Sequence, residues 1–285
     1  MSNVRTIDLL AEVDGVPSLP EAMSEVMPLV NDPETSADKI AEAIQKDVGL
    51  TAKLLKLANS AYYSFPNRIG SVQLAVSLLG MREVRNVVLS ASLLGMFKAF
   101  KGSPFLSFQE LWVHSVNCAV AARTIASQVS DLSPEEAFVG GMLHDVGMVV
   151  LIDKLQDDLK KIVQMAEKEN IPFVEAESRY WEHTHARIGG VLARKWKLPK
   201  AGVEAIEQHH IFSPESASFK LTAVVHLADS LCIERGVVYR LERDETQENP
   251  QSWDVLDERQ ESVRMWLREL VEKDEEKAQV LLDVL

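Results

Sequence analysis

Residues 133–147 read SPEEAFVGGMLHDVG, which joins a predicted helix to a histidine–aspartate pair. Ser133 followed by Pro134 is typical of a helix start, because serine caps the first turn and proline is favoured at the first helical position. The helix is expected to end at His144 and Asp145, in an apolar setting that would bury both side chains. Burying such a pair is costly unless it finds partners, so either a structural hydrogen bond or a metal ion could explain it.

Helix signals recur on both sides of this stretch, whereas strand signals do not. Before it, helices are predicted to begin near Ser18, Ser36, Gly49, Ser71 and Glu83, with Gly80 separating the last two, and a long one runs from Ser107 to about residue 129. After it, helical stretches are expected at about 153–169, 172–182, 184–196, 200–210 and 218–234. The sequence has no useful alternation of apolar and polar residues and no Asn-Gly hairpin turn. We therefore predict an all-α protein.

Two helical lobes and a tail are predicted. Lys101-Gly102-Ser103-Pro104 separates an N-terminal lobe, residues 15–100, from a second lobe, residues 105–235. The first lobe contains no histidine, no cysteine and no glycine-rich phosphate loop, so its residues can pack and bind but offer no catalytic groups. Residues 240–285 form an acidic helical extension, with 14 acidic and 7 basic residues from Arg240 onward.

Composition excludes several classes of function. The 285 residues carry a net charge of −13, which argues against nucleic acid as a partner because phosphate binding needs a concentrated basic face. No segment supplies the roughly 18 clean apolar residues of a membrane span, and no signal peptide is present, so we expect a cytoplasmic protein with no membrane partner. The two cysteines, Cys118 and Cys232, are interpreted as buried small residues. A metal site is therefore expected to use histidine and carboxylate.

All seven histidines lie between residues 114 and 226. Each predicted helix from residue 107 onward can direct imidazoles or carboxylates toward a common axis, as helical bundles with di-metal sites do. Imidazole and carboxylate ligands suit iron, manganese, nickel or zinc and do not choose among them. His183 and His226 are interpreted as ordinary core or surface histidines. The candidate ligands are His114, His144, Asp145, His185, His209, His210 and Asp229.

The order of these residues resembles the HD superfamily of metal-dependent phosphohydrolases, and in particular the ligand pattern of its dinuclear branch, which includes the HD-GYP phosphodiesterases. The chain is more similar to the HDOD family, the HD-related output domain of bacterial signalling proteins. The similarity covers about residues 15–235. Its segments are Val16–Pro20, Asp47–Tyr63, Ile69–Val76, Leu79-Gly80, His183–Gly189, Trp196–Pro199 and Gln208–His210.

The resemblance implies a ligand set and also two departures from it. It implies one metal held by His114, His144, Asp145 and Asp229, and a second held by His185, His209 and His210 with Asp145 bridging. Where the phosphodiesterases carry a lysine after the His-Asp pair, this chain has Met148, and no Gly-Tyr-Pro motif follows His210. Both departures weaken the cyclic-dinucleotide interpretation.

Two functions fit this resemblance. The first is a regulatory module of bacterial signal transduction that binds a protein partner or a phosphorylated small ligand and holds one or two divalent ions. The second is an active phosphohydrolase that acts on a nucleotide or a cyclic dinucleotide, with His144 and Asp145 at the catalytic centre. A helix-turn-helix DNA binder fits the helices but not the charge.

Overall fold

A computed structural model describes the chain at residues 34–60, 65–98, 103–181, 183–211, 213–237 and 249–256, and at the isolated positions 25, 26, 28, 29, 32, 241, 265, 268, 269, 279, 282 and 283. The predicted helix start near Ser18 and nearly all of the acidic extension lie outside these residues. Within them the regular elements are helices, and the sole extended pairing is an isolated bridge between Ser103 and Leu106. The all-α prediction is confirmed.

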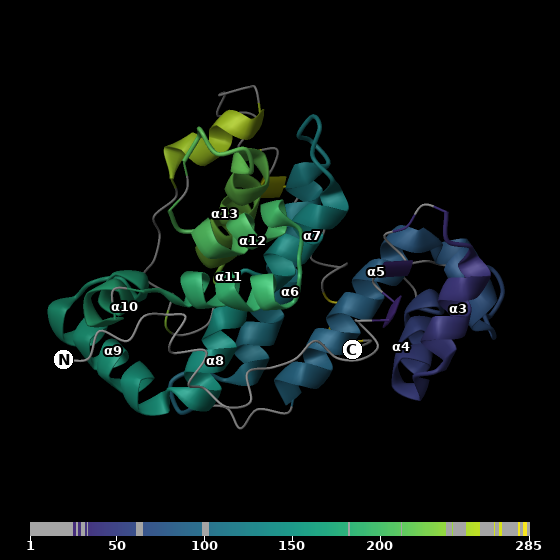
Figure 1. The fold of residues 1–285 in the computed structure, drawn as a ribbon, viewed down its shortest axis with the longest axis horizontal. Coiled ribbons are helices and arrows are strands. Elements are labelled where there is room, and N and C mark those ends of the chain that lie inside the picture. Colours follow the sequence, from purple (N-terminus) through teal and green to yellow (C-terminus); the bar gives the residue numbers. More distant parts are fainter. Residues whose placement is uncertain are drawn as a thin grey trace. The chain divides into compact units, whose positions relative to one another are not determined.

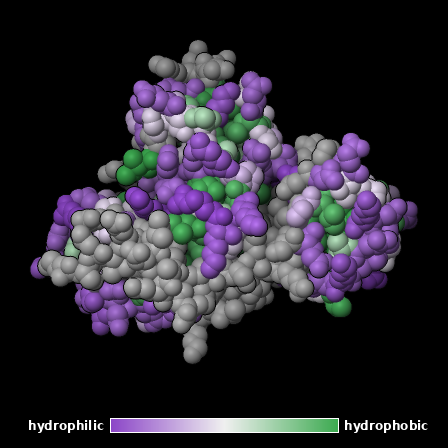
Figure 2. All heavy atoms as spheres, in the orientation of Figure 1, coloured by the Kyte–Doolittle hydropathy of each residue, from purple (hydrophilic) through white to green (hydrophobic). Residues whose placement is uncertain are grey.

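The described helices form two compact units, one with α3 to α5 and the other with α6 to α13 and the 3₁₀ helix η1 (Figure 1). No helix in the described ranges combines the length and the apolar character that crossing a bilayer requires. The face drawn in Figure 2 is largely hydrophilic, with apolar side chains showing between the polar ones.

The smaller unit consists of α3 (Ala37–Gln45), α4 (Val48–Ala58) and α5 (Val72–Lys98). Ser36 and Asp47 cap α3 and α4 through their side chains, as short polar residues at helix starts commonly do. Gly80 interrupts α5 with φ 77° and ψ 163°, a conformation that glycine tolerates far better than other residues. The predicted break at Gly80 is thus present as a kink between two helical segments.

The larger unit carries every candidate ligand. Its long first helix begins with the predicted capping box, in which Ser107 and Glu110 satisfy each other's backbone N–H groups. An apolar core, including Ile125, Val224 and Trp253, packs among α6, α7, α12, α13 and η1. The elements are α6 (Phe108–Ala126), α7 (Pro134–Leu143), α8 (Val146–Lys154), α9 (Gln156–Glu169), α10 (Phe173–Trp181), α11 (His185–Lys195), α12 (Lys200–Gln208), α13 (Phe219–Glu234) and η1 (Pro250–Leu256).

Helix α8 corrects the sequence prediction, which resumed helical structure only at about residue 153. The chain re-enters a helix directly after Asp145, and all residues from Val146 to Ile152 are buried. A helix that is apolar on every side has no amphipathic period to detect. The capping signal is also missing, because Asp145 stands at the N-cap position but its side chain caps no backbone group. That carboxylate has other partners, described below.

Two glycines allow helices to approach closely around the ligands. A Cβ atom on Gly141 would lie 2.6 Å from the backbone oxygen of Cys118, so α7 can lie against α6 only without a side chain there. A Cβ atom on Gly147 would lie 1.9 Å from the backbone oxygen of His185, where α8 meets α11. Backbone contacts this close fix the distances between the helices that carry the candidate ligands.

Candidate metal centre

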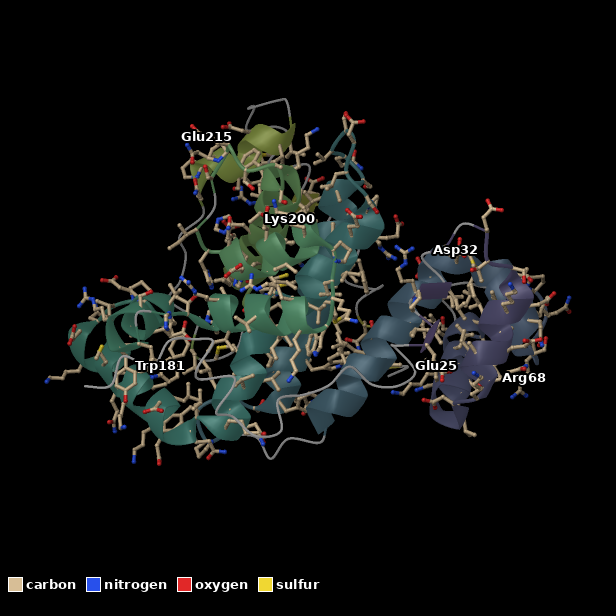
Figure 3. All side chains as sticks on the ribbon, in the orientation of Figure 1. Glu25, Asp32, Arg68, Trp181, Lys200 and Glu215 are labelled. Atoms are coloured by element: carbon tan, nitrogen blue, oxygen red, sulfur yellow. The ribbon has the colours of Figure 1, made fainter. Side chains whose placement is uncertain are left out.

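The seven predicted ligands converge on one interior region of the larger unit. Six of them are buried, and His210 is partly exposed. Lys200, labelled in Figure 3, marks the first turn of α12, the helix whose end carries two of these imidazoles. The ligands are distributed as follows: His114 on α6, His144 and Asp145 at the junction of α7 and α8, His185 at the start of α11, His209 and His210 after α12, and Asp229 on α13.

Asp145 lies at the centre, with one carboxylate oxygen toward each half of the cluster. Its Oδ2 lies 3.1 Å from Nε2 of His144 and 3.6 Å from Nε2 of His114. Its Oδ1 lies 3.2 Å from Nε2 of His185 and 3.5 Å from Nε2 of His209. The geometry therefore divides the imidazoles into two groups that share a single carboxylate.

Asp229 completes the first group. Its Oδ1 lies 3.2 Å from Nε2 of His114 and 3.8 Å from Nε2 of His144, and those two nitrogens are 3.2 Å apart. Two imidazole nitrogens and oxygens of two carboxylates therefore lie within a few ångströms of one another. The contacts described for these atoms include no lysine or arginine side chain.

Three imidazoles are oriented by backbone carbonyls. In each, Nδ1 lies within hydrogen-bonding distance of a carbonyl oxygen, which can only accept, so Nδ1 carries the proton. A neutral imidazole has one N–H group, and its Nε2 is then a lone pair directed into the cluster. The carbonyls are Val237 O, 2.7 Å from His114, Gly141 O, 2.7 Å from His144, and Ile206 O, 2.9 Å from His209.

His185 is oriented by a buried carboxylate instead. Glu177 on α10 accepts the backbone N–H of His185 at 3.0 Å through Oε1 and its Nδ1–H at 2.7 Å through Oε2. The Nε2 atom of His185 then faces Nε2 of His210 at 2.9 Å, a contact between two nitrogens that needs a proton or a metal ion between or beside them.

The pKa values of the clustered side chains are shifted by burial and by the close contacts among them. Burial works against the charged imidazole of His185, but the carboxylates of Glu177 and Asp145 outweigh it and raise the pKa of His185 well above its usual value. Burial likewise opposes the ionised carboxyl of Asp145, yet His144 and the other imidazoles hold its pKa well below the usual range. Desolvation and neighbouring imidazoles lower the pKa of His210. Asp145 is thus an anion that attracts positive charge.

Among the buried atoms of the cluster, Nε2 of His209 and Oδ1 of Asp229 have no hydrogen-bond partner among the described residues. A buried polar atom without a hydrogen bond costs about 1–3 kcal/mol, so such atoms call for an explanation. The donor set of imidazole nitrogens and carboxylate oxygens fits divalent ions, and bound ions would satisfy these atoms. Ligand atoms of His144, Asp145 and His209 lie within 4.8 Å of one another, as do those of His185, His209 and His210.

His226 lies near the cluster but its ring nitrogens have other partners. Nδ1 is 2.8 Å from the carbonyl oxygen of His209, and Nε2 accepts the backbone N–H of Asn249 at 2.9 Å. His226 therefore supports the chain at the end of α12 and ties it to the segment before η1.

Two residues of the cluster were missed from the sequence. Glu177 shares the buried face of α10 with Phe173 and Ala176. An acidic residue on an otherwise apolar helix face could have identified it in the sequence. Cys118, interpreted as a core residue, is buried, but its Sγ lies 3.4 Å from Nε2 of His114. Its signal was the four-residue spacing from His114, which puts both side chains on one helix face.

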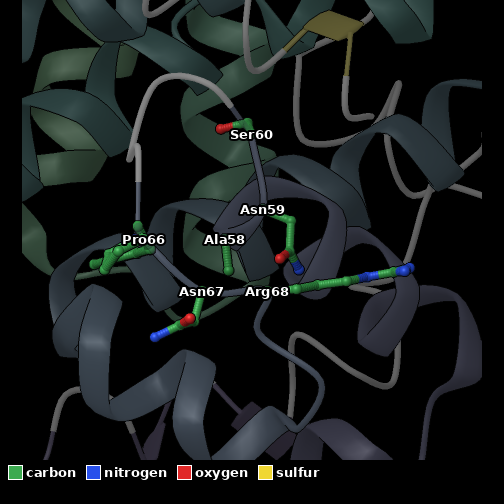
Figure 4. A pocket seen from close by; sticks show the side chains of 7 residues that line it. Ala58, Asn59, Ser60, Pro66, Asn67 and Arg68 are labelled. Carbon is green, nitrogen blue, oxygen red and sulfur yellow. The ribbon is translucent and has the colours of Figure 1, made fainter.

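The smaller unit has a cavity of about 420 Å³ where α4 ends (Figure 4). Asn59 organises it: its amide oxygen accepts the N–H of Ile69, and its amide nitrogen donates to the carbonyl oxygens of Leu55 and Ile69. Ser60, Asn67 and Arg68 add polar groups to the lining. The cavity is a second place where a small ligand could bind, without catalytic groups.

Comparison with known protein families and sequences identifies one family and two curated relatives. The family model of the HDOD domain matches residues 16–212. An uncharacterized protein from Treponema pallidum is 27% identical over 199 residues, which cover 70% of this chain and 38% of that protein. Ribonuclease Y from Mycoplasma mycoides is 25% identical over 127 residues, which cover 45% of this chain and 23% of the ribonuclease. The chain thus matches less than half the length of either curated relative.

Solved structures share the fold over almost the whole chain. An HDOD domain protein of unknown function from Geobacter sulfurreducens has a TM-score of 0.80 and 28% identity, and the match covers 98% of this chain and 95% of that one. A protein from Shewanella amazonensis, provisionally named a phosphohydrolase, has a TM-score of 0.74 and 24% identity, with 97% of each chain covered. The second likeness is evidence for the fold alone.

Proposed function

This chain belongs to the HDOD domain family, and we propose that it is a metal-holding module of bacterial signal transduction. Its buried imidazoles and carboxylates would bind one or two divalent ions, of iron, manganese, nickel or zinc. The observation that supports this most strongly is the convergence of imidazole Nε2 atoms on Asp145 while their Nδ1 atoms are held by carbonyls or by Glu177. Lone pairs and carboxylate oxygens gathered in this way repel one another unless a cation lies among them.

Two ion positions are proposed, with Asp145 shared between them. His114, His144 and Asp229 would hold the first ion, and His185, His209 and His210 the second. The separate oxygens of Asp145 support this division, because each lies against a different group of imidazoles. The second position is the one nearer the surface, since His210 is partly exposed.

The regulatory role rests on features outside the cluster. The α3–α5 unit contains no histidine or cysteine in its helices but has a cavity with Asn67 and Arg68 in its lining. An arginine and amide groups suit a phosphorylated small ligand or an acidic segment of a protein partner. In this proposal the metal stabilises the larger unit, and binding at the smaller unit carries the signal.

Phosphoester hydrolysis is the second candidate, and the partial exposure of His210 favours it. A bound divalent ion would lower the pKa of a water molecule and would neutralise a phosphate. Of this chain's own residues, His144 and Asp145 would be the catalytic pair. Met148 is buried and uncharged, so it supplies no cation to a phosphate.

The two candidates are separated by metal analysis followed by a hydrolysis screen. Protein purified without chelator should contain at least one tightly bound divalent ion per chain, and Asp145→Ala should lose it. The screen should cover nucleotides, cyclic dinucleotides and, because of the similarity to a ribonuclease, RNA. Turnover that disappears in His144→Ala with its helicity retained would establish the hydrolase. Metal-loaded protein without turnover would support the regulatory module, and a metal content unaffected by Asp145→Ala would refute the proposed centre.

A further inference from the structure

Cys118 lies in the wall of the first proposed ion position. It sits on α6 four residues after His114, and residues at this spacing project from the same helix face, as paired metal ligands on one helix do. Its Sγ lies 3.4 Å from Nε2 of His114, the atom directed into the cluster. Ligand atoms of His114, Cys118, His144 and Asp229 all lie within 4.8 Å of one another.

A second observation at this position points to a ligand. Asp229 is 3% exposed, and its Oδ1 has no hydrogen-bond partner among the described residues, yet it belongs to the same four-atom group as the sulfur. A carboxylate oxygen buried without a donor is the group that most needs a cation. The sulfur of Cys118 therefore lies beside a buried carboxylate oxygen that a cation would stabilise.

The backbone keeps the sulfur in this place. Gly141 packs against the carbonyl of Cys118, where an added Cβ would come within 2.6 Å of the oxygen, and Gly141 also accepts the Nδ1–H of His144. The same contact thus positions the thiol and one of the imidazoles.

We propose that Cys118 is a further ligand of the first ion, so that this position is a mixed nitrogen, oxygen and sulfur site. The inference rests on the proposed metal centre and extends it to metal choice. A thiolate is a soft ligand, so it favours zinc or iron over manganese more strongly than imidazole and carboxylate ligands do. On binding, the thiol proton passes to solvent and a sulfur–metal bond forms, with no change of oxidation state.

Cobalt(II) titration of metal-free protein tests the proposal, because a thiolate bound to cobalt gives a near-ultraviolet charge-transfer absorption that imidazole and carboxylate do not. Wild type should bind cobalt and show this absorption, and Cys118→Ala and Cys118→Ser should bind cobalt with the absorption lost. Cys232→Ser is the control for the neighbouring thiol: Cys232 is a buried free cysteine that interacts with Cys118 but belongs to none of the ligand groups, so this variant should keep the absorption.

The outcomes separate this inference from the proposed function. Cobalt bound by wild type without the absorption overturns the role of Cys118 and leaves the metal centre standing. No cobalt bound at all overturns the metal centre itself. The wild-type spectrum alone decides the role of Cys118, so the inference stays testable even if the Cys118 variants fold poorly.

Discussion

Glu177 holds His185 at two points, accepting its backbone N–H at 3.0 Å and its ring Nδ1–H at 2.7 Å. The two hydrogen bonds fix both the ring orientation and the tautomer, so that Nε2 faces Asp145. Carboxylates in this position also make a metal-bound imidazole a stronger ligand. Glu177 thus acts on the proposed second ion through His185 without touching it.

Replacing Glu177 by glutamine should weaken metal binding. The amide keeps one acceptor, but its NH₂ group would face one of the two N–H donors of His185. Loss of such a supporting contact typically lowers metal affinity about 10–100-fold, which a competition titration with a chromophoric chelator would measure. Glu175→Gln is the matched control, because Glu175 is exposed on the same helix and pairs with Arg179. Equal affinities in all three proteins would contradict the supporting role of Glu177.

Asp145→Asn should remove metal binding at both positions together. The substitution keeps the size of the side chain but removes the charge that faces His144 on one side and His185 on the other. Elemental analysis of the purified variant should therefore find less than a tenth of the metal content of wild type. Asp153 on the same helix pairs with Lys154, away from the imidazoles, and Asp153→Asn should retain the metal. Loss of one ion with full retention of the other would show that Asp145 does not bridge.

Stabilisation by the metal should increase with pH. In the metal-free protein the raised pKa of His185 means that its protonated form contributes stability, which is fully present below about pH 6.5 and is lost as the pH rises through the raised value. A metal ion requires neutral His185, so proton and metal compete, and each displaced proton changes the apparent metal affinity by roughly tenfold per pH unit.

The measurement is the difference in melting temperature between zinc-loaded and chelator-treated protein. It should widen as the pH rises from about 6.5 through the raised pKa of His185. A difference that shrinks as the pH rises would show that the metal does not displace a proton from the imidazoles.

Most of the proposed ligands can be predicted from the sequence because histidine in apolar helices is rare enough to stand out, and because the order of these histidines and aspartates resembles that of a known family. The sequence predicts α7 well, since Ser133 and Pro134 act locally. It fails for α8, whose start lacks a capping contact because the Asp145 side chain is turned to the imidazoles. The role of Glu177 could not be predicted from the sequence. It depends on which face of α10 contacts His185, and packing between the two helices decides that.

Gly147→Ala should severely destabilise the larger unit. The added methyl group would lie 1.9 Å from the backbone oxygen of His185, and neither backbone can move without separating α8 from α11. Overpacking of this kind costs about 1–3 kcal/mol and more where the obstacle is backbone, so urea unfolding should show a loss at the upper end or no folded protein. Metal affinity should fall too, because Asp145 and His185 stand next to this contact.

Gly202→Ala is the control for that prediction. Gly202 lies within α12 with no atom within 4 Å of the added Cβ, so alanine should stabilise the helix by up to about 1 kcal/mol. The opposite signs of the two glycine substitutions would assign the cost at Gly147 to contact between the helices rather than to the loss of a flexible residue. If Gly147→Ala unfolds at the same urea concentration as wild type, the close approach of α8 and α11 is wrong, and with it the 3.2 Å separation of Asp145 and His185.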